Sequence, residues 1–123
     1  MSDLIRVMVI KPGHVPEITE IENTLKGFQE VVGGYIETVP LESIDDDLRV
    51  VLNEEGKNIG LPMNRVWKPY GVGGYAVDIM VGTIFIVSTH LDGFTSLTDE
   101  QIKKLEEHVD EYLDPNLSKE VYA

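Results

Sequence analysis

The residues best suited to bind a ligand gather in one polar stretch in the middle of the chain. Asn64 and Arg65 end the segment LNEEGKNIGLPMNR, directly after Pro62-Met63, and no turn requires an Asn-Arg pair there. Lys57 and Lys68 add two cationic groups to a third of the chain that is otherwise apolar and acidic. Because arginine offers a forked pair of donors to phosphate, this cluster predicts a site for a small anionic ligand such as a nucleotide.

Aromatic side chains could complete such a site by stacking on a base. The candidates are Tyr35, Trp67 and Tyr75, although residues of this kind more often fill the edge of a core. The alternative for the polar pair is structural. Arg65 would then pair with a nearby carboxylate, and Asn64 would bond the backbone of a loop.

The chain carries no familiar catalytic pattern. It has no cysteine, no HExxH and no GxSxG sequence, and its three histidines are far apart. Gly71-Val72-Gly73-Gly74 lacks the spacing of a phosphate-binding loop. We therefore expect a non-catalytic protein that needs no metal and no cofactor.

The charge balance supports a second hypothesis. Ten basic and 22 acidic residues leave a formal net charge of −12, which disfavours direct binding to nucleic acid. Duplex DNA carries about one charge per 1.7 Å, so this charge corresponds to roughly 20 Å of duplex. The chain could thus imitate DNA, unless its acidic surface serves only solubility. The acidic interaction surface would consist of Asp45, Asp46, Asp47, Glu106, Glu107, Asp110 and Glu111.

Length and composition indicate one soluble domain. The chain has 123 residues, without cysteine and without an apolar run of the roughly 20 residues that a membrane span requires. We expect a single domain over residues 1–115, a loosely ordered tail over 116–123, no contact with membranes and a location in the bacterial cytoplasm. The sequence leaves open whether the chain forms a homo-oligomer.

The apolar pattern predicts an α+β fold with a mostly antiparallel sheet of about five to six strands and two helices, the second C-terminal. Strands are expected over 4–10, weakly over 15–21, over 35–39, in a hairpin formed by 48–52 and 58–61, and over 75–87 with a bend or break near Gly82.

The two helices carry their own start and stop signals. The first is expected to begin at an Asn23 cap and to end at Gly33. The second is expected to begin with a capping box, Thr98 to Gln101, and to end at Asp114-Pro115. Residues 66–74 and 88–96 are expected to be loops.

In these features the chain resembles a family of small proteins from phages, prophages and plasmids of Gram-positive bacteria, the domain of unknown function 3846. The resemblance covers about residues 7–105. It rests on a Pro-Gly after the first strand, VGGYIE, NEEGK, Leu61-Pro62 with Asn64-Arg65, Asp78-Ile79, VGT with Phe85-Ile86, and SLTDEQ. The family implies no activity. Its members tend to lie among accessory genes, including antirestriction genes, which implies a role in conflict with host defences.

Three functions follow as expectations. The first is a non-catalytic accessory protein of a phage or mobile element that counters host defence by binding a small nucleotide-type signal or a host protein. The second is an acidic DNA mimic that inhibits a host protein which binds nucleic acid. The third is a structural or regulatory phage component.

Overall fold

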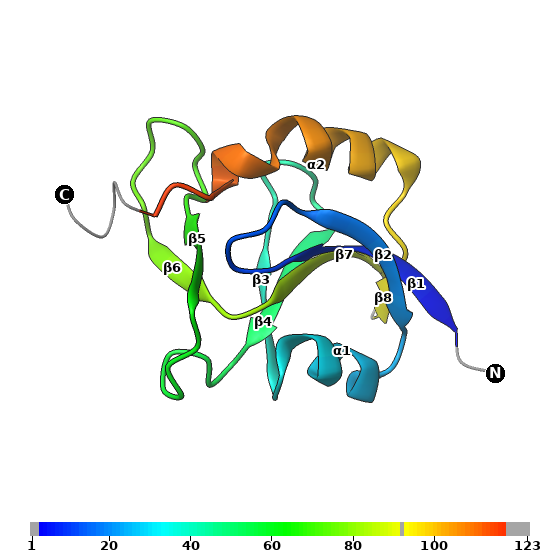
Figure 1. Cartoon of the computed structure of the whole chain (residues 1–123). Helices are drawn as coiled ribbons and strands as arrows, with labels where there is room; N and C mark the ends of the chain where they lie inside the picture. The colour runs from blue at the N-terminus through cyan, green and yellow to red at the C-terminus, as the bar shows by residue number, and fades with distance from the viewer. Residues whose placement is uncertain (1–2, 92, 118–123) are drawn as a thin grey trace.

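The computed structural model describes residues 3–91 and 93–117, which form an α+β fold (Figure 1). A strand hairpin precedes the first helix. Between the two helices the strands come in successive pairs, first from the larger sheet, then from the smaller, then from the larger again. The elements are β1 (Leu4–Ile10), β2 (Glu17–Glu22), α1 (Leu25–Val32), β3 (Ile36–Pro40), β4 (Leu48–Asn53), β5 (Met63–Trp67), β6 (Asp78–Val81), β7 (Ile84–His90), β8 (Gly93–Thr95), α2 (Asp99–Tyr112) and β9 (Leu113–Asp114).

The strands form two antiparallel sheets. The larger has the order β2-β1-β7-β4-β3, and β8 pairs with an end of β7. The smaller has the order β6-β5-β9. The α+β class, the mostly antiparallel sheet and the C-terminal second helix are thus confirmed. The second, three-stranded sheet is an addition to what the sequence predicts.

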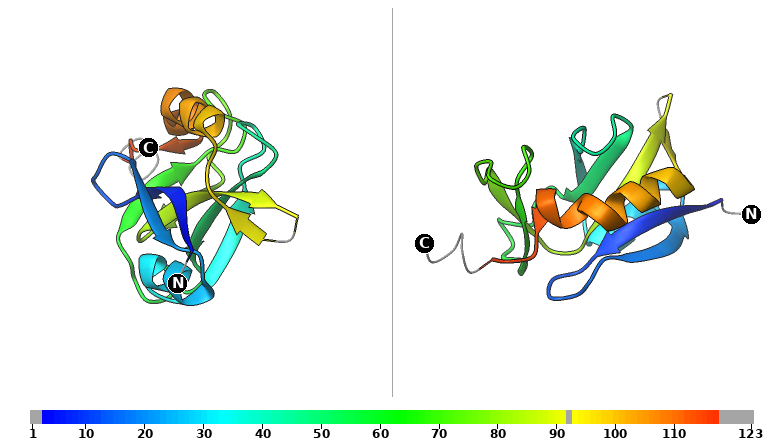
Figure 2. Two further views of the ribbon diagram at one scale, coloured as in Figure 1. Left: turned by 90° about the vertical axis from the view of Figure 1, so that its right-hand side faces the viewer. Right: turned by 90° about the horizontal axis from the view of Figure 1, so that it is seen from above.

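The larger sheet lies between the two helices (Figure 2). Alternation along its strands sends one set of side chains to α1, where Phe28 and Val32 pack on Val7, Phe85 and Val87. The opposite set packs under α2 and against the smaller sheet, in a cluster that includes Ile10, Val50, Ile86, Met80 and Leu105. The central strands are therefore apolar on both faces, which explains their nearly continuous apolar sequence.

Helix α1 depends on a close approach that only glycine permits. Its cap is Thr24, whose hydroxyl accepts from the Gly27 amide, so the expected Asn23 cap is wrong by one residue. A Cβ at Gly27 would lie 2.4 Å from the Glu22 carbonyl oxygen. Gly27 therefore lowers helix propensity but lets the helix pack against the end of β2. Gly33, with φ of 84°, ends the helix as expected.

Helix α2 begins with the expected capping box. The Thr98 hydroxyl accepts from the Gln101 amide, and the Gln101 side chain accepts from the Thr98 amide, both at 3.0 Å. Leu105, Val109 and, just beyond the helix, Leu113 are buried in the core beneath it. The helix ends at Tyr112, two residues before the expected Asp114-Pro115. Leu113–Asp114 then pairs with β5 as strand β9.

Gly82 is the point at which the chain passes from one sheet to the other. Its φ is 72°, and a Cβ there would lie 2.6 Å from Leu61 Cδ1. The sequence predicts an interruption near Gly82 but leaves open whether it bends one strand or separates two. The structure has two strands, β6 and β7, which belong to different sheets.

Three expectations about strands and loops are wrong. Residues 58–60 form turns and Leu61 belongs to no strand, so 58–61 is not the second arm of a hairpin, and β4 is flanked by β3 and β7 instead. The segment 66–74 begins inside β5 instead of being loop throughout. The segment 88–96 holds the end of β7 and all of β8, which pair antiparallel.

The ends of the chain are described only in part. Of the expected tail, Asn116 and Leu117 are described, whereas 118–123 lie outside the described residues. In the described part of the chain, neither helix combines the length and apolar character of a membrane-spanning helix.

Candidate functional site

Asn64 is buried and connects the end of β1 to the bend at Gly82. It is 1% exposed and lies at a β-bulge, where the pairing of β5 with β6 shifts between Met63 and Arg65. Its side-chain amide donates to the carbonyl oxygens of Ile10 at 2.8 Å and Gly82 at 2.7 Å. The structural alternative stated above is therefore the arrangement found for Asn64: its side chain bonds backbone.

Arg65 is also buried, at 3% exposure, because the bulge interrupts the alternation that would have turned one of the two side chains outward. Its Nη2 donates to the His14 carbonyl at 2.6 Å, and its Nη1 donates to the backbone and side-chain oxygens of Asn64. Burial lowers its pKa, while the charges of Asp110 and Asp114 oppose that shift. Arg65 thus holds backbone carbonyls and not the paired carboxylate expected in the structural alternative.

The two lysines of the predicted site already have carboxylate partners. Lys57 pairs with Asp78, and Lys68 Nζ lies 2.9 Å from Asp114 Oδ2. Tyr35 and Tyr75 are 70% and 89% exposed and stack on no other described aromatic ring. The seven predicted residues therefore do not form one site. Lys57 and Trp67 line a common cavity.

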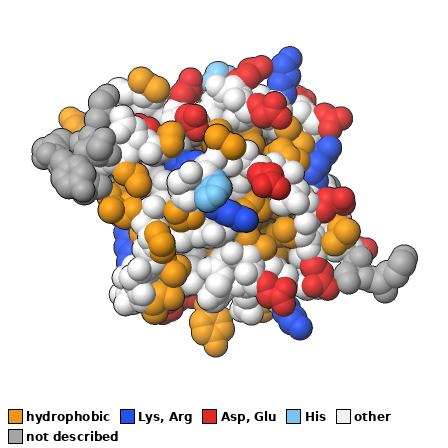
Figure 3. Space-filling view, viewed as in Figure 1, with side chains coloured by type: hydrophobic (Ala, Val, Ile, Leu, Met, Phe, Trp, Pro, Cys, Tyr) orange, Lys and Arg blue, Asp and Glu red, His pale blue; other side chains and the backbone are white. Residues whose placement is uncertain are grey.

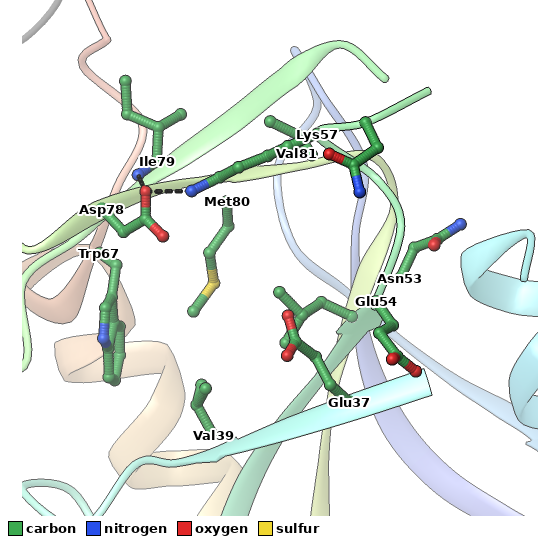
Figure 4. A pocket seen from close by; sticks show the side chains of 12 residues that line it. Glu37, Val39, Asn53, Glu54, Lys57, Trp67, Asp78, Ile79, Met80 and Val81 are labelled. Carbon is green, nitrogen blue, oxygen red and sulfur yellow. Dashed lines mark hydrogen bonds and ion pairs between the residues drawn. The ribbon is translucent and has the colours of Figure 1, made fainter. Parts of the chain in front are cut away.

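That cavity lies between the two sheets and has a volume of about 260 Å³ (Figure 4). One wall is formed by β3, β4 and the turn after β4, and the other by Trp67 of β5 and residues of β6. Its apolar part consists of Val39, Leu52, Trp67 and Met80, all of which belong to the core beneath α2.

Polar groups stand around this apolar part. Glu37 and Glu54 lie on the side of β3 and β4, opposite the pair formed by Lys57 and Asp78 (Figure 4). Three carboxylates and one ammonium leave the lining with an excess of negative charge. The cavity is therefore better suited to a cationic group than to a phosphate.

Glu37, Glu54, Asp78 and Met80 were not among the residues that the sequence predicted for a site. The signal available for Glu37 was its position two residues before Val39 in the expected strand, which places both side chains on the same face. That pattern identifies a shared face, but it cannot show that the face lies opposite a second sheet.

The structure brings the two parts of the predicted acidic interaction surface, the Asp45 to Asp47 loop and helix α2, side by side. The Asp45 to Asp47 loop lies beside α2, since the Asp45 carboxylate accepts from Lys104 Nζ at 3.3 Å and from Gln101 Nε2 at 3.5 Å. Along α2, Glu106, Glu107 and Asp110 are exposed and Glu111 is half-buried. Figure 3 shows acidic side chains along the edge of the molecule that carries this helix.

The contact between the loop and the helix shifts two pKa values. Burial alone would raise the pKa of Asp45, but hydrogen bonds from the Asp47 amide, Lys104 and Gln101 together outweigh it and lower the pKa. The hydrogen bond to Asp45 raises the pKa of Lys104. Both groups are therefore held in their charged forms.

No group of three or more metal-binding side chains occurs among the described residues. His14 lies in the turn between β1 and β2, whereas His108 lies on α2 and contacts Glu107 and Glu111 of the same helix. The acidic residues near α2 are thus surface charges without the geometry of a metal centre.

These features define a small α+β protein with an open cavity between two antiparallel sheets and an acidic helix. The family model for the domain of unknown function DUF3846 matches residues 5–110, and the chain belongs to this family. No curated protein and no solved structure matches the chain.

Proposed function

We propose that this protein is a non-catalytic accessory protein of a phage or mobile element that counters host defence by binding a basic surface of a host protein. The observation that carries the proposal is the contact of Asp45 with Lys104 and Gln101. It joins the acidic loop to α2, two segments that are more than 50 residues apart in the chain, and makes one acidic face of them.

The charges of this face support a partner that normally binds nucleic acid. Helix α2 carries six acidic and two basic residues. With 14 residues it is about 21 Å long, and its excess of acidic over basic residues gives this length of surface a net negative charge. A host protein that uses lysine and arginine to hold phosphates would meet a complementary potential here.

Binding of a nucleotide-type signal has weaker support. The residues that suggested it are engaged otherwise: Asn64 and Arg65 hold buried carbonyls, and Lys57 and Lys68 pair with carboxylates. A phosphate at this place would have to displace those partners.

The test compares two variants with the same change in net charge. One neutralises the acids of α2, as Glu106→Gln, Glu107→Gln, Asp110→Asn and Glu111→Gln. The control neutralises four acids of β2 and α1, as Glu17→Gln, Glu20→Gln, Glu22→Gln and Glu30→Gln. Phage plating is measured on hosts with and without nuclease-based defences, and inhibition of the purified nuclease is measured against salt concentration.

We expect the α2 variant to lose protection and inhibition while the control keeps both, and we expect inhibition by the unaltered protein to weaken as salt rises. Equal loss of protection and inhibition in the two variants would show that net charge alone matters. Full protection by the α2 variant would place the binding surface elsewhere.

A further inference from the structure

We propose that the cavity between the two sheets is a receptor for the guanidinium group of an arginine side chain on the bound partner, with Glu37 and Glu54 as its carboxylates and Trp67 as its aromatic wall. This inference goes beyond the proposed function, because the cavity is a site apart from the acidic face of α2. Its central claim can nevertheless be measured without the host protein.

The apolar part of the cavity fits the stem of such a side chain. Val39, Leu52 and Met80 offer aliphatic and thioether surface, and Trp67 offers an indole ring only partly covered by the core. Arginine buries its methylene groups against apolar surface and stacks its planar head on aromatic rings. A guanidinium held over the indole also gains a cation–π attraction.

The carboxylates supply the charge that an arginine requires. Asp78 already pairs with Lys57 and also accepts from the Ile79 amide. Glu37 and Glu54 have no hydrogen-bonded or ion-paired side-chain partner among residues 3–91 and 93–117, and both are exposed at the mouth. Two negative charges in the lining are therefore available to an incoming cation.

The position of these two acids favours a forked donor. Glu37 lies opposite Leu52 in the β3–β4 pair, and the Glu54 amide donates to the Tyr35 carbonyl at 2.8 Å. Glu37 and Glu54 are thus diagonal neighbours on one face, a relationship that places side chains roughly 7 to 8 Å apart at their bases. A guanidinium has donors on several edges and can bridge two carboxylates at this spacing, whereas an ammonium is a compact and strongly hydrated charge.

Trp67 makes the cavity directly observable, because it is the only tryptophan in the chain. The fluorescence of the full-length protein would be titrated with N-acetyl-arginine amide, which presents the side chain as a protein does. N-acetyl-citrulline amide, a neutral molecule of the same shape, is the matched ligand control. We expect a saturable change with the arginine compound that is at least about tenfold weaker with the citrulline compound.

Variants test which groups are responsible. Glu37→Gln with Glu54→Gln is expected to weaken binding of the arginine compound by about tenfold or more, while Glu30→Gln on α1 leaves it unchanged. Backbone amide shifts in NMR, followed in the same titration, should cluster at β3, the end of β4 and β6. A thermal unfolding curve checks that the double variant is folded.

Four results would overturn the proposal. They are equal binding of the citrulline compound, unchanged binding by the double variant, amide shifts confined to other parts of the molecule, and the absence of saturable change in both fluorescence and NMR. Free arginine provides one more comparison. If it bound far more tightly than the capped compound, the occupant would be a free amino acid and not a side chain of a partner.

These outcomes are separate from the test of the proposed function. Loss of protection on neutralising α2 leaves the arginine titration unaffected, since none of the α2 acids lines the cavity. Conversely, if the cavity did not bind arginine, the proposed role of the acidic face of α2 would be unaffected.

Discussion

The side-chain amide of Asn64 donates to the carbonyl oxygen of Gly82 at 2.7 Å, so the bulge of the smaller sheet is tied to the point where the chain enters the larger one. The same amide holds the carbonyl of Ile10, the last residue of β1. One buried side chain thereby fixes the positions of three segments that are far apart in sequence.

Replacement of Asn64 by Ala should destabilise the protein by about 2 to 3 kcal/mol, because it leaves two buried carbonyls without a donor. Urea unfolding monitored by circular dichroism measures the change. Asn58→Ala is the control, since its amide bonds only the exposed Glu55 side chain at 3.1 Å, and it should cost less than about 0.5 kcal/mol. Equal midpoints for the two variants would contradict the role given to Asn64.

Replacement of Arg65 by Ala should cost about 3 kcal/mol, because three donated hydrogen bonds from a charged group to oxygens of Asn64 and His14 are lost. Where the variant is still folded, the affinity of the cavity for N-acetyl-arginine amide should be unchanged, since Arg65 does not line it. Stability comes from urea unfolding and affinity from Trp67 fluorescence. A folded Arg65→Ala variant with altered affinity for N-acetyl-arginine amide would show that Arg65 takes part in binding.

Alanine substitutions at three glycines should separate backbone strain from steric overlap. Gly60 has φ of 71° and open space around its missing Cβ, so Gly60→Ala should cost about 1 to 2 kcal/mol. Gly82→Ala should cost more, because it adds the contact with Leu61 to a similar φ. Gly93 has neither feature and should tolerate alanine. Thermal unfolding of the three variants ranks them, and a Gly82 variant no less stable than the Gly60 variant would refute the overlap.

The contact of Asp45 with α2 should depend on pH. Its pKa in the folded protein lies below the ordinary value of 3.8, so its stabilising contribution is present above that value and is lost as pH falls through the folded-state pKa. The stability difference between the unaltered protein and Asp45→Asn should therefore shrink below about pH 4. Urea unfolding between acidic and neutral pH measures it. Asp46→Asn, at an exposed position, is the control, and a difference that grew on acidification would have the wrong sign.

Replacement of Thr98 by Ala should remove the capping bond to the Gln101 amide and cost about 1 kcal/mol. Thermal unfolding measures the loss. Thr98→Ser keeps the hydroxyl and should retain most of the stability, and a Ser variant as weak as the Ala variant would mean that the cap does not act through this bond.

Elements with strong local signals were predictable. The capping box of α2 and the glycine that ends α1 are determined by residues within one turn of the helix, and both are found as expected. The hairpin expected over 48–52 and 58–61 is absent, because strand pairing is decided between distant residues. Strand β4 pairs instead with β7, whose residues lie more than 30 positions further along the chain.

The candidate site illustrates the same division. Lys57 and Trp67 could be selected from the sequence by residue type, yet Glu37 and Glu54 could not, because they face Trp67 and Asp78 only after β3 and β4 pack opposite the smaller sheet. Asn64 and Arg65 carried a strong chemical signal, but the bulge turned both inward.

The sequence by itself determined the α+β class, the two helices, the capping box of α2, the glycine that ends α1, an interruption near Gly82 and the acidic charge, since each depends on composition or on neighbours along the chain. The tertiary structure decided which strands pair, that the Asn-Arg pair is buried, and that a carboxylate of β3 and one just after β4 share a cavity with a tryptophan. These relationships arise from packing between segments that are distant in sequence, and the free energy of that packing cannot be read from a local sequence pattern.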